Sequence, residues 1–231
     1  LVLITRLGVI KRINLMAYKT KRTNGLYAIN LDEGDQLLYV LRSAGNDDII
    51  VATNRGISIR FSEDDVREMG RHARGVRAIM LDEGDYVVGA GIIPDGSDEN
   101  DLYILTITEN GFGKRSFTGE YKRQHRGGRG LICHGVSAKT GALAGLKLVR
   151  ESEEVMLITD GGIIIRTRIS EIPVYGRSAS GVIVMRLEEG STVARFAVVD
   201  PETESENKET EEAQVEAEVS QESVETVGEE Q

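Results

Sequence analysis

Short apolar runs separated by polar turns recur along most of the chain. The first run, Val2-Leu3-Ile4, passes through Leu7-Gly8 into a second run, Val9-Ile10-Lys11-Arg12. Apolar runs of this length, joined by a two-residue turn that contains glycine, are typical of β-hairpins. No run approaches the ~20 consecutive apolar residues that a membrane-spanning helix needs. The pattern therefore predicts an all-β fold and excludes a helical membrane protein.

The same hairpin signature occurs four times. Each copy has a Thr-x-x-Gly turn and an arginine four residues after its glycine. The turn glycines are Gly8, Gly56, Gly111 and Gly162, at spacings of 48, 55 and 51 residues, and the arginines are Arg12, Arg60, Arg115 and Arg166. The acidic loop 94–101 accounts for the longer middle spacing. A nearly constant period of this length indicates a repeat architecture.

A polar segment and a second glycine follow each hairpin. The second glycines are Gly25, Gly75, Gly130 and Gly181. Three repeats then carry an acidic turn that contains glycine, at 31–35, 81–85 and 187–191, whereas the third repeat has Ala138-Lys139-Thr140-Gly141-Ala142. We expect the strands on either side of this turn to form a second hairpin. The polar segment should cross the unit over one apolar anchor, a position occupied by Tyr18, Val66, Tyr121 and Ile172.

Four short strands in each unit predict a propeller-like blade. Because a single blade cannot bury both faces of its sheet, neighbouring blades must stack. The predicted blades span about 1–46, 47–101, 102–152 and 153–199. The chain starts in strand-like sequence without an initiating Met, so we expect a fragment or a processed C-terminal part.

The charge of the chain is divided between two regions. The 231 residues carry 28 Lys+Arg and 38 Asp+Glu, a formal net charge of −10. Residues 200–231 hold 13 of the acidic residues and one Lys, which leaves residues 1–199 with a net charge of +2. From Pro201 onward there is no aromatic residue, Leu or Ile, so this stretch cannot bury enough apolar surface to fold. We predict a disordered acidic tail, which either aids solubility or competes with another polyanion for a basic surface.

The basic residues of the repeats recur at two positions. One set follows the first hairpin turn, and the other precedes the second glycine. On stacked blades, both sets would form a ribbon of positive charge along one rim, a surface suited to the phosphates of a DNA duplex. The predicted DNA-binding residues are Lys11, Arg12, Lys21, Arg22, Arg60, Arg71, Arg74, Lys114, Arg115, Arg126, Arg129, Arg166, Arg168 and Arg177.

Ion pairing within the blades is the alternative use of these arginines. Asp and Glu recur in the same repeats, but they cluster in the acidic turns and in loop 94–101, away from the basic segments. Such segregation favours a positive edge over a mixed surface. The sequence has no recognition-helix signature, and aromatic residues make up only 5% of it, so we expect backbone-directed, weakly sequence-selective binding.

The most distinctive local motif is a basic, glycine-rich run, which we call the box-like loop. It comprises Gln124, His125, Arg126, Gly127, Gly128, Arg129 and Gly130. Its glycines let the main chain approach another surface closely, and its two arginines can bind phosphate bidentately. Together with the repeats, this loop resembles the C-terminal domain of the DNA gyrase A subunit, whose hallmark is a Gln-Arg-Arg-Gly-Gly-Lys-Gly box. His125 replaces the first Arg of that box and Arg129 replaces its Lys. The segments 59–67, 109–115 and 164–172 are also similar to that family.

The resemblance implies a six-bladed β-pinwheel in which neighbouring blades exchange a strand, and of which this chain holds the last four blades. The family's principal box usually lies in its first blade, so the box-like loop matches a repeat of it in a later blade. The function implied is non-catalytic wrapping of double-stranded DNA for ATP-dependent negative supercoiling. The implied partners are the gyrase B subunit, together with the rest of the gyrase A subunit, in an A₂B₂ assembly in the bacterial cytoplasm, at the nucleoid. ATP and Mg would belong to that holoenzyme, and no cofactor is expected in this chain.

Two alternatives stay open at this point. One is the C-terminal domain of the topoisomerase IV A subunit, which guides DNA without strong wrapping. The other is a protein-interaction propeller whose basic rim binds an acidic partner.

No catalytic or metal site is predicted. Cys133 is the single cysteine and lies with His134 in an apolar strand, which favours a buried thiol. The acidic run 63–65 follows Ser62, a residue that can cap a helical turn, where acidic side chains are favourable. The catalytic tyrosine of the family belongs to its N-terminal region and matches none of the seven tyrosines here.

Overall fold

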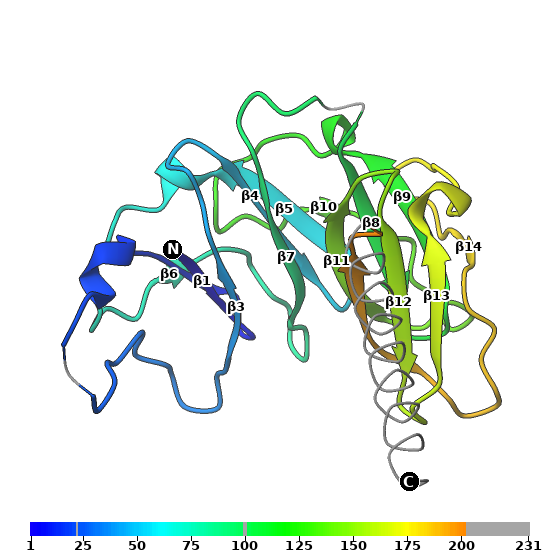
Figure 1. The fold of residues 1–231 in the computed structure, drawn as a ribbon, viewed down its shortest axis with the longest axis horizontal. Coiled ribbons are helices and arrows are strands. Elements are labelled where there is room, and N and C mark those ends of the chain that lie inside the picture. Colours follow the sequence, from blue (N-terminus) through cyan, green and yellow to red (C-terminus); the bar gives the residue numbers. More distant parts are fainter. Residues whose placement is uncertain (22, 99–100, 202–231) are drawn as a thin grey trace, which may run out of the picture.

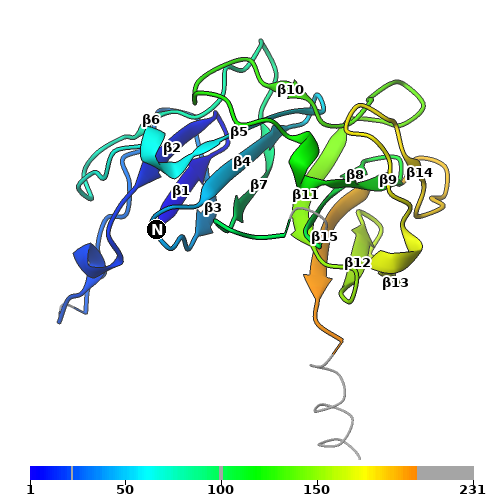
Figure 2. The same cartoon turned by 90° about the horizontal axis from the view of Figure 1, so that it is seen from above.

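The structure is a computed structural model that describes residues 1–21, 23–98 and 101–201. Its strands form four antiparallel sheets, set side by side in an arc that has a concave and a convex side (Figures 1 and 2). We number these sheets as blades 1 to 4 from the N-terminus. The all-β, four-bladed arrangement that the repeats predict is therefore confirmed, while Arg22 and tail residues 202–231 lie outside the described residues.

Each blade is built around the hairpin predicted from its glycine turn. The hairpin strands are β1 (Val2–Thr5) with β2 (Val9–Arg12), β4 (Asp48–Thr53) with β5 (Ile57–Ser62), β8 (Tyr103–Thr108) with β9 (Phe112–Phe117), and β12 (Glu154–Thr159) with β13 (Ile164–Arg168). One further strand per blade lines the concave side: β3 (Leu37–Leu41), β7 (Val87–Ile93), β11 (Leu143–Val149) and β15 (Val193–Val199) (Figure 2).

The blades exchange short strands, as the family resemblance implies. The exchanged strands β6 (Val76–Arg77), β10 (Leu131–Ile132) and β14 (Val182–Ile183) pair with β2, β5 and β9 of the preceding blade. The predicted second hairpin is wrong for this reason. The strands on either side of the acidic turn 81–85, β6 and β7, lie in different blades, because β6 pairs with β2 and β7 pairs with β4.

The segments that lead to the exchanged strands run over the convex side, and we call them crossing segments. Each begins with a 3-10 turn: η1 (Leu15–Tyr18), η2 (Glu63–Asp65), η3 (Thr118–Glu120) or η4 (Ile169–Glu171). The Ser62 hydroxyl accepts a hydrogen bond from the Asp64 amide at 3.3 Å and so caps η2. The predicted anchors Val66, Tyr121 and Ile172 are buried, and Tyr18 is half-buried.

Apolar side chains fill the spaces between successive blades. One cluster joins Ile4 and Ile10 of blade 1 to Val51 and Phe61 of blade 2, and equivalent clusters join the later blades. On the concave side, a Cβ atom on Gly89 of β7 would lie 2.6 Å from the Leu146 Cβ atom of β11. Glycine in the inner strands therefore lets the blades pack closely. Among the residues described, no helix is long and apolar enough to cross a membrane.

Candidate nucleic-acid interface

The arginines after the first hairpin turns are paired with carboxylates. Arg60 Nε lies 2.7 Å from Asp48 Oδ2, and one guanidinium nitrogen of Arg115 lies 2.8 Å from Glu151 Oε1. The remaining ion pairs join Arg12 to Glu63 and Asp64, Arg166 to Glu154, and Arg168 to Glu154. The alternative of ion pairing within the blades therefore describes this column better than a free cationic ribbon does.

Arg60 shows what this column does for the fold. Its guanidinium donates to the Asp48 carboxylate and to the carbonyls of Thr118, at 3.1 Å, and Tyr121, at 3.4 Å. The Asp48 side chain is 2% exposed and also binds Arg123 at 2.8 Å. The cluster ties blade 2 to the start of the next crossing segment, so Arg60 is half-buried and is not directed to solvent.

The two lysines that follow the first hairpin turns are inside the molecule. Lys11 Nζ donates to the carbonyls of Ala28, at 2.8 Å, and Arg71, at 2.6 Å. Lys114 Nζ donates to the Ser116 hydroxyl and the Arg177 carbonyl, both at 2.9 Å. Both side chains are fully buried, and burial lowers the pKa of Lys11 and lowers the pKa of Lys114 to about 8. As a correction, we remove these two lysines from the proposed phosphate contacts.

The second predicted set lies on the crossing segments of the convex rim. Lys21 and Arg74 are exposed, and Arg71 is half-buried. Arg74 forms an ion pair with Asp32, and Arg129, whose side chain is 79% exposed, lies 3.8 Å from Asp82. Exposed ion pairs of this kind contribute little to stability and can be exchanged for phosphate. Arg177 differs, because its guanidinium donates to the Ile132 carbonyl.

The box-like loop is held by main-chain hydrogen bonds and by Arg126. The amide of Gln124 donates to the Arg60 carbonyl at 2.7 Å, and the amide of Gly127 donates to the Ala78 carbonyl at 2.6 Å. Arg126 Nε donates to the Asp65 carbonyl at 2.7 Å. Arg126 is consequently half-buried and stiffens the loop.

Two other side chains of the loop point outward. The His125 side chain is fully exposed, at 3.7 Å from the Asp65 carboxylate, and the largely exposed Arg129 follows the two central glycines. The φ angle of Gly127 is +77°, which favours glycine. The loop thus presents exposed cationic groups on a main chain of defined shape.

The structure adds cations that the sequence argument missed. Arg77 is the exposed second residue of β6, and its main chain and Cδ atom lie beside Gly127 of the box-like loop. Arg67, Lys122 and Arg123 are exposed on the crossing segments. For Arg67, Lys122 and Arg123, the sequence signal was their position between the apolar anchor and the second glycine of the repeat. Arg77 had no such signal, because only the strand exchange brings it beside the loop.

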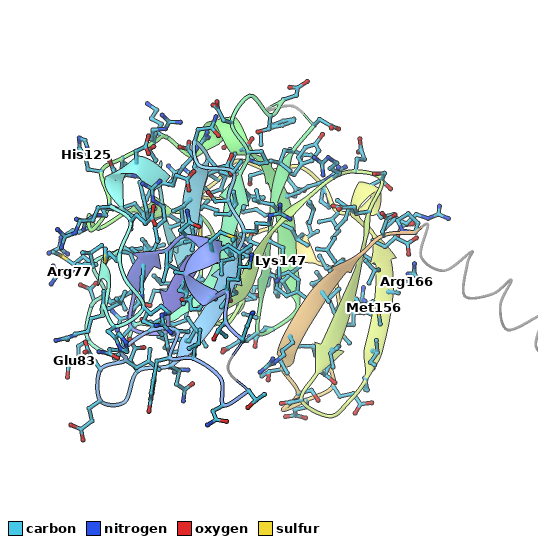
Figure 3. The ribbon with its side chains drawn as sticks, turned by 60° about the vertical axis from the view of Figure 1, so that its left-hand side comes forward. Arg77, Glu83, His125, Lys147, Met156 and Arg166 are labelled. Atoms are coloured by element: carbon cyan, nitrogen blue, oxygen red, sulfur yellow. The ribbon has the colours of Figure 1, made fainter. Side chains whose placement is uncertain are left out.

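The edge of the molecule that carries the box-like loop has basic and acidic residues at different levels. Figure 3 shows His125, Arg77 and Glu83 along one edge of the molecule, with Glu83 at its lower end. Glu83 belongs to the acidic turn 81–85, and the crossing segments above it carry the exposed cations. The separation is incomplete, because Arg74 and Arg129 of the crossing segments form ion pairs with Asp32 and Asp82 of the acidic turns.

Blade 4 departs from this arrangement. Its crossing segment, 169–181, contains one basic residue, Arg177, and an exposed aromatic residue, Tyr175. Arg166 and Arg168 of this blade lie on β13 and share Glu154. Among the crossing segments, the exposed cations therefore lie on those of blades 1 to 3, whereas blade 4 carries exposed arginines, among them Arg168, Arg186 and Arg195, outside its crossing segment.

The Cys133-His134 pair is structural. Burial raises the pKa of Cys133 to about 12 and lowers the pKa of His134 to about 4, so the thiol and the neutral imidazole persist at pH 7. His134 Nε2 donates to the Ser180 carbonyl at 3.0 Å, which leaves Nδ1 to accept from the Thr106 hydroxyl at 2.9 Å. Across the described part of the chain, no group of three or more His, Cys, Asp or Glu side chains is placed to hold a metal ion.

Comparisons with known proteins agree with this geometry. The family described as "DNA gyrase C-terminal domain, beta-propeller" matches residues 1–44, 47–94, 102–149 and 153–200. The chain is 41% identical over 199 residues to the DNA gyrase A subunit of Aminobacterium colombiense, and 43% identical over 212 residues to that of Clostridium acetobutylicum. These alignments cover 86% and 92% of this chain but 24% and 25% of the relatives, so the chain spans about a quarter of their length.

Solved structures share the fold. The crystal structure of the C-terminal domain of DNA topoisomerase IV has a TM-score of 0.80 and 28% identity, over 87% of this chain and 62% of that one. The structure of the DNA gyrase A C-terminal domain has a TM-score of 0.72 and 23% identity, over 85% of this chain and 64% of that one. The second likeness, at its low identity, concerns the fold alone.

Proposed function

Since the chain belongs to the family of DNA gyrase C-terminal domains, we propose that it is a non-catalytic module that holds a curved DNA duplex against its convex rim. The observation that carries this proposal is the succession of exposed cations on the crossing segments of blades 1 to 3. Lys21, Arg74 and Arg129 are exposed on three successive crossing segments, four, one and one residues before the second glycine of each repeat. A duplex that followed the arc would meet them in turn.

The rim suits backbone contacts rather than base reading. Bending 20–30 base pairs by 40–90° costs roughly 1–6 kcal/mol, which several phosphate contacts can offset. The described residues include no α-helix that could enter the major groove. Binding is therefore directed at shape and charge, with little preference for sequence.

The box-like loop is the proposed centre of this contact. His125 and Arg129 project from it, and Arg77 reaches its side from the exchanged strand. Arg126 supports the loop through the carbonyls of Asp65, at 2.7 Å, and Arg77, at 3.1 Å, and its Nη2 nitrogen can face a phosphate. The acidic turn 81–85 below the loop would repel a duplex that slipped off the rim.

A double substitution of the loop tests the proposal. Arg126→Ala with Arg129→Ala should weaken binding of every duplex sequence to a similar extent and lower the salt slope of log K by about 2, since each phosphate contact contributes ~0.9. Arg186→Ala with Arg195→Ala is the matched control, because it removes two exposed arginines from blade 4. Equal losses in both variants, measured by fluorescence anisotropy across a salt series, would contradict the assignment of the loop.

The parent enzyme is the finer part of the proposal. We favour gyrase because the curated relatives at about 40% identity are DNA gyrase A subunits. This chain would then serve ATP- and Mg-dependent negative supercoiling in an A₂B₂ assembly with gyrase B subunits. The higher TM-score to the topoisomerase IV domain favours the second candidate. Supercoiling of relaxed plasmid by the reconstituted enzyme indicates gyrase, and relaxation or decatenation alone indicates topoisomerase IV.

The remaining alternative is a protein-interaction propeller whose basic rim binds an acidic partner. A mobility-shift assay with a short duplex separates the two classes, since a protein-binding rim would leave the duplex unshifted at low salt. For residues 200–231, we propose competition with DNA for the same rim, on the basis of 13 acidic residues and one Lys. Truncation after Val199 should then tighten duplex binding, and unchanged affinity would leave only a role in solubility.

A further inference from the structure

His125 is the side chain of the box-like loop whose charge can change near neutral pH. The arginines of the loop stay protonated, whereas an imidazole ordinarily gains or loses its proton between pH 5 and 8. The His125 side chain is fully exposed. Figure 3 shows it at the outer edge of the molecule, above Arg77. The ring can therefore exchange its proton with solvent and can reach a phosphate on the rim.

A carboxylate is fixed beside this ring. Nδ1 of His125 lies 3.7 Å from Asp65 Oδ2, and the same oxygen accepts a hydrogen bond from the Arg126 amide at 3.4 Å. Asp65 is the last residue of η2, and its side chain is 28% exposed. The Arg126 guanidinium donates to main-chain carbonyls instead. Among the described residues, His125 is the only cationic partner within ion-pair distance of the Asp65 carboxylate.

The crossing segment of blade 4 has the same carboxylate without the imidazole. Glu120, the last residue of η3, accepts from the Arg177 amide at 2.7 Å, as Asp65 does from the box-like loop. The position of His125 is occupied there by Gly176, whose Cβ would lie 3.7 Å from Glu120 Oε2. The architecture of the crossing segments therefore sets this position beside a carboxylate, and the box-like loop fills it with a titratable group.

The other charged groups around the loop keep their charge between pH 6 and 7.5. The elements packed against the loop are β5, η2, β6 and the acidic turn 81–85. Carboxylates stay ionised and guanidiniums stay protonated across this range. Besides Asp65, the charged groups on these elements that lie nearest the loop are Arg60, Glu63, Asp64, Arg77 and Asp82. A change in the charge of the loop between pH 6 and 7.5 must therefore come from His125.

We propose that His125 contacts a DNA phosphate as the imidazolium, so that duplex binding takes up a proton at the box-like loop. This inference rests on the proposed function. A neutral ring leaves the Asp65 carboxylate uncompensated beside the duplex, where it repels phosphate. A protonated ring offsets that carboxylate and adds one cationic contact. Because the phosphate favours the protonated ring, duplex affinity rises as the pH falls through the range in which imidazole titrates.

Duplex binding at pH 7.5 and pH 6 tests this proposal. For the unmodified chain, the lower pH should tighten binding by about three- to tenfold, within the limit of tenfold per pH unit for one proton. It should also raise the salt slope of log K by up to ~0.9, the share of one phosphate contact. His125→Gln should bind equally at both pH values, and His125→Arg should bind tightly at both. Fluorescence anisotropy with a labelled duplex of mixed sequence measures all three chains.

His72→Gln is the matched control and should retain the pH response. His72 is exposed on the crossing segment of blade 2, but no carboxylate of the described residues lies within ion-pair distance of it. Burial lowers the pKa of His134 to about 4, so this third histidine stays neutral in both buffers. Thermal melts by circular dichroism at both pH values check that each variant is folded.

The outcomes separate this inference from the proposed function. Equal binding of the unmodified chain at both pH values would overturn the inference alone. A pH response that survives in His125→Gln, or that is lost equally in His72→Gln, would do the same. Absence of duplex binding by the unmodified chain at pH 6 and low salt would instead overturn the proposed function.

Discussion

The crossing segments of blades 3 and 4 are built alike and differ in what they present. Both begin with a 3-10 turn, pass over a buried anchor and end at a glycine of positive φ. Residues 118–130 carry four cations. Lys122, Arg123 and Arg129 are exposed, and Arg126 is half-buried. Residues 169–181 carry only Arg177, whose guanidinium is bound to a carbonyl. Shared architecture therefore does not give shared surface chemistry.

The difference continues beneath the two segments. Under blade 4's crossing segment, polar side chains of residues 114–134 bind its carbonyls: Lys114 with Arg177 at 2.9 Å, Ser116 with Tyr175 at 2.7 Å, and His134 with Ser180 at 3.0 Å. Under the box-like loop, the equivalent positions are apolar and are occupied by Ile59, Phe61 and Ile79. Both segments share main-chain hydrogen bonds, such as Tyr175 N–H to the Arg115 carbonyl and Gln124 N–H to the Arg60 carbonyl. The segment of blade 4 is held in addition by buried polar side chains, whereas the box-like loop lies over apolar side chains.

This contrast explains how the box-like loop can keep the His125 and Arg129 side chains exposed. Its amides and carbonyls are satisfied by main-chain partners such as Arg60 and Ala78, so the loop needs few of its side chains for stability. The segment of blade 4 has main-chain partners as well, and three side chains from outside it add further hydrogen bonds to its carbonyls. We infer that the first arrangement serves a binding surface and the second serves the junction between blades.

The largest effect is expected where the box-like loop meets the strand below it. Gly130→Ala should destabilise the chain by about 3 kcal/mol or more, because the residue has φ of +76° and its Cβ would lie 2.5 Å from the Ser58 carbonyl oxygen. Gly128→Ala is the matched control, since its Cβ would make ordinary contacts at 3.6 Å, and it should change stability by less than about 0.5 kcal/mol. Denaturant unfolding of both variants measures the difference. Similar midpoints would show that the loop tolerates a shift at Gly130.

The second prediction concerns His134, one of the buried polar side chains that hold the crossing segment of blade 4. Burial lowers the pKa of His134 to about 4 from 6.5, so the folded chain favours the neutral ring. Stability from this group is complete above pH 6.5 and is lost as the pH falls toward 4, at a cost of about 2 kcal/mol by pH 5. His134→Met places the residue found at the equivalent position, Met185, and should flatten this part of the pH profile. An unchanged slope in urea titrations between pH 7 and 5 would show that the imidazole is not the titrating group.

The sequence predicted the four-bladed fold well because its evidence was local. Glycine turns such as Asn110-Gly111 define hairpins through their own φ requirements, and their spacing gave the repeat. The strand exchange was not readable from the residues alone, since β6, β10 and β14 are two residues long and their partners lie in another repeat. The family resemblance supplied it instead.

The candidate site was predicted less well, for a physical reason. Lys114 and Arg115 are recurrent cations on a strand, but β9 is covered on both faces, so neither the repeat nor the charge revealed their burial. Most cations on the described crossing segments are exposed, because those segments lie on the outside of the arc. Arg77 joins them only through the exchange. Charge location along the sequence therefore predicts a basic surface only where the topology is already known.

The smallest effect separates the two crossing segments at a single residue each. Arg177→Ala should leave duplex affinity within about twofold and the salt slope unchanged, because its guanidinium is bound to the Ile132 carbonyl and blade 4 supplies few neighbouring cations. Arg129→Ala should lower the slope by ~0.9, the share of one phosphate contact. Anisotropy titrations of both variants at several salt concentrations compare them directly. Equal slopes for the two variants would mean that the duplex contacts blade 4 as closely as blade 3, and the functional contrast between the two crossing segments would then be wrong.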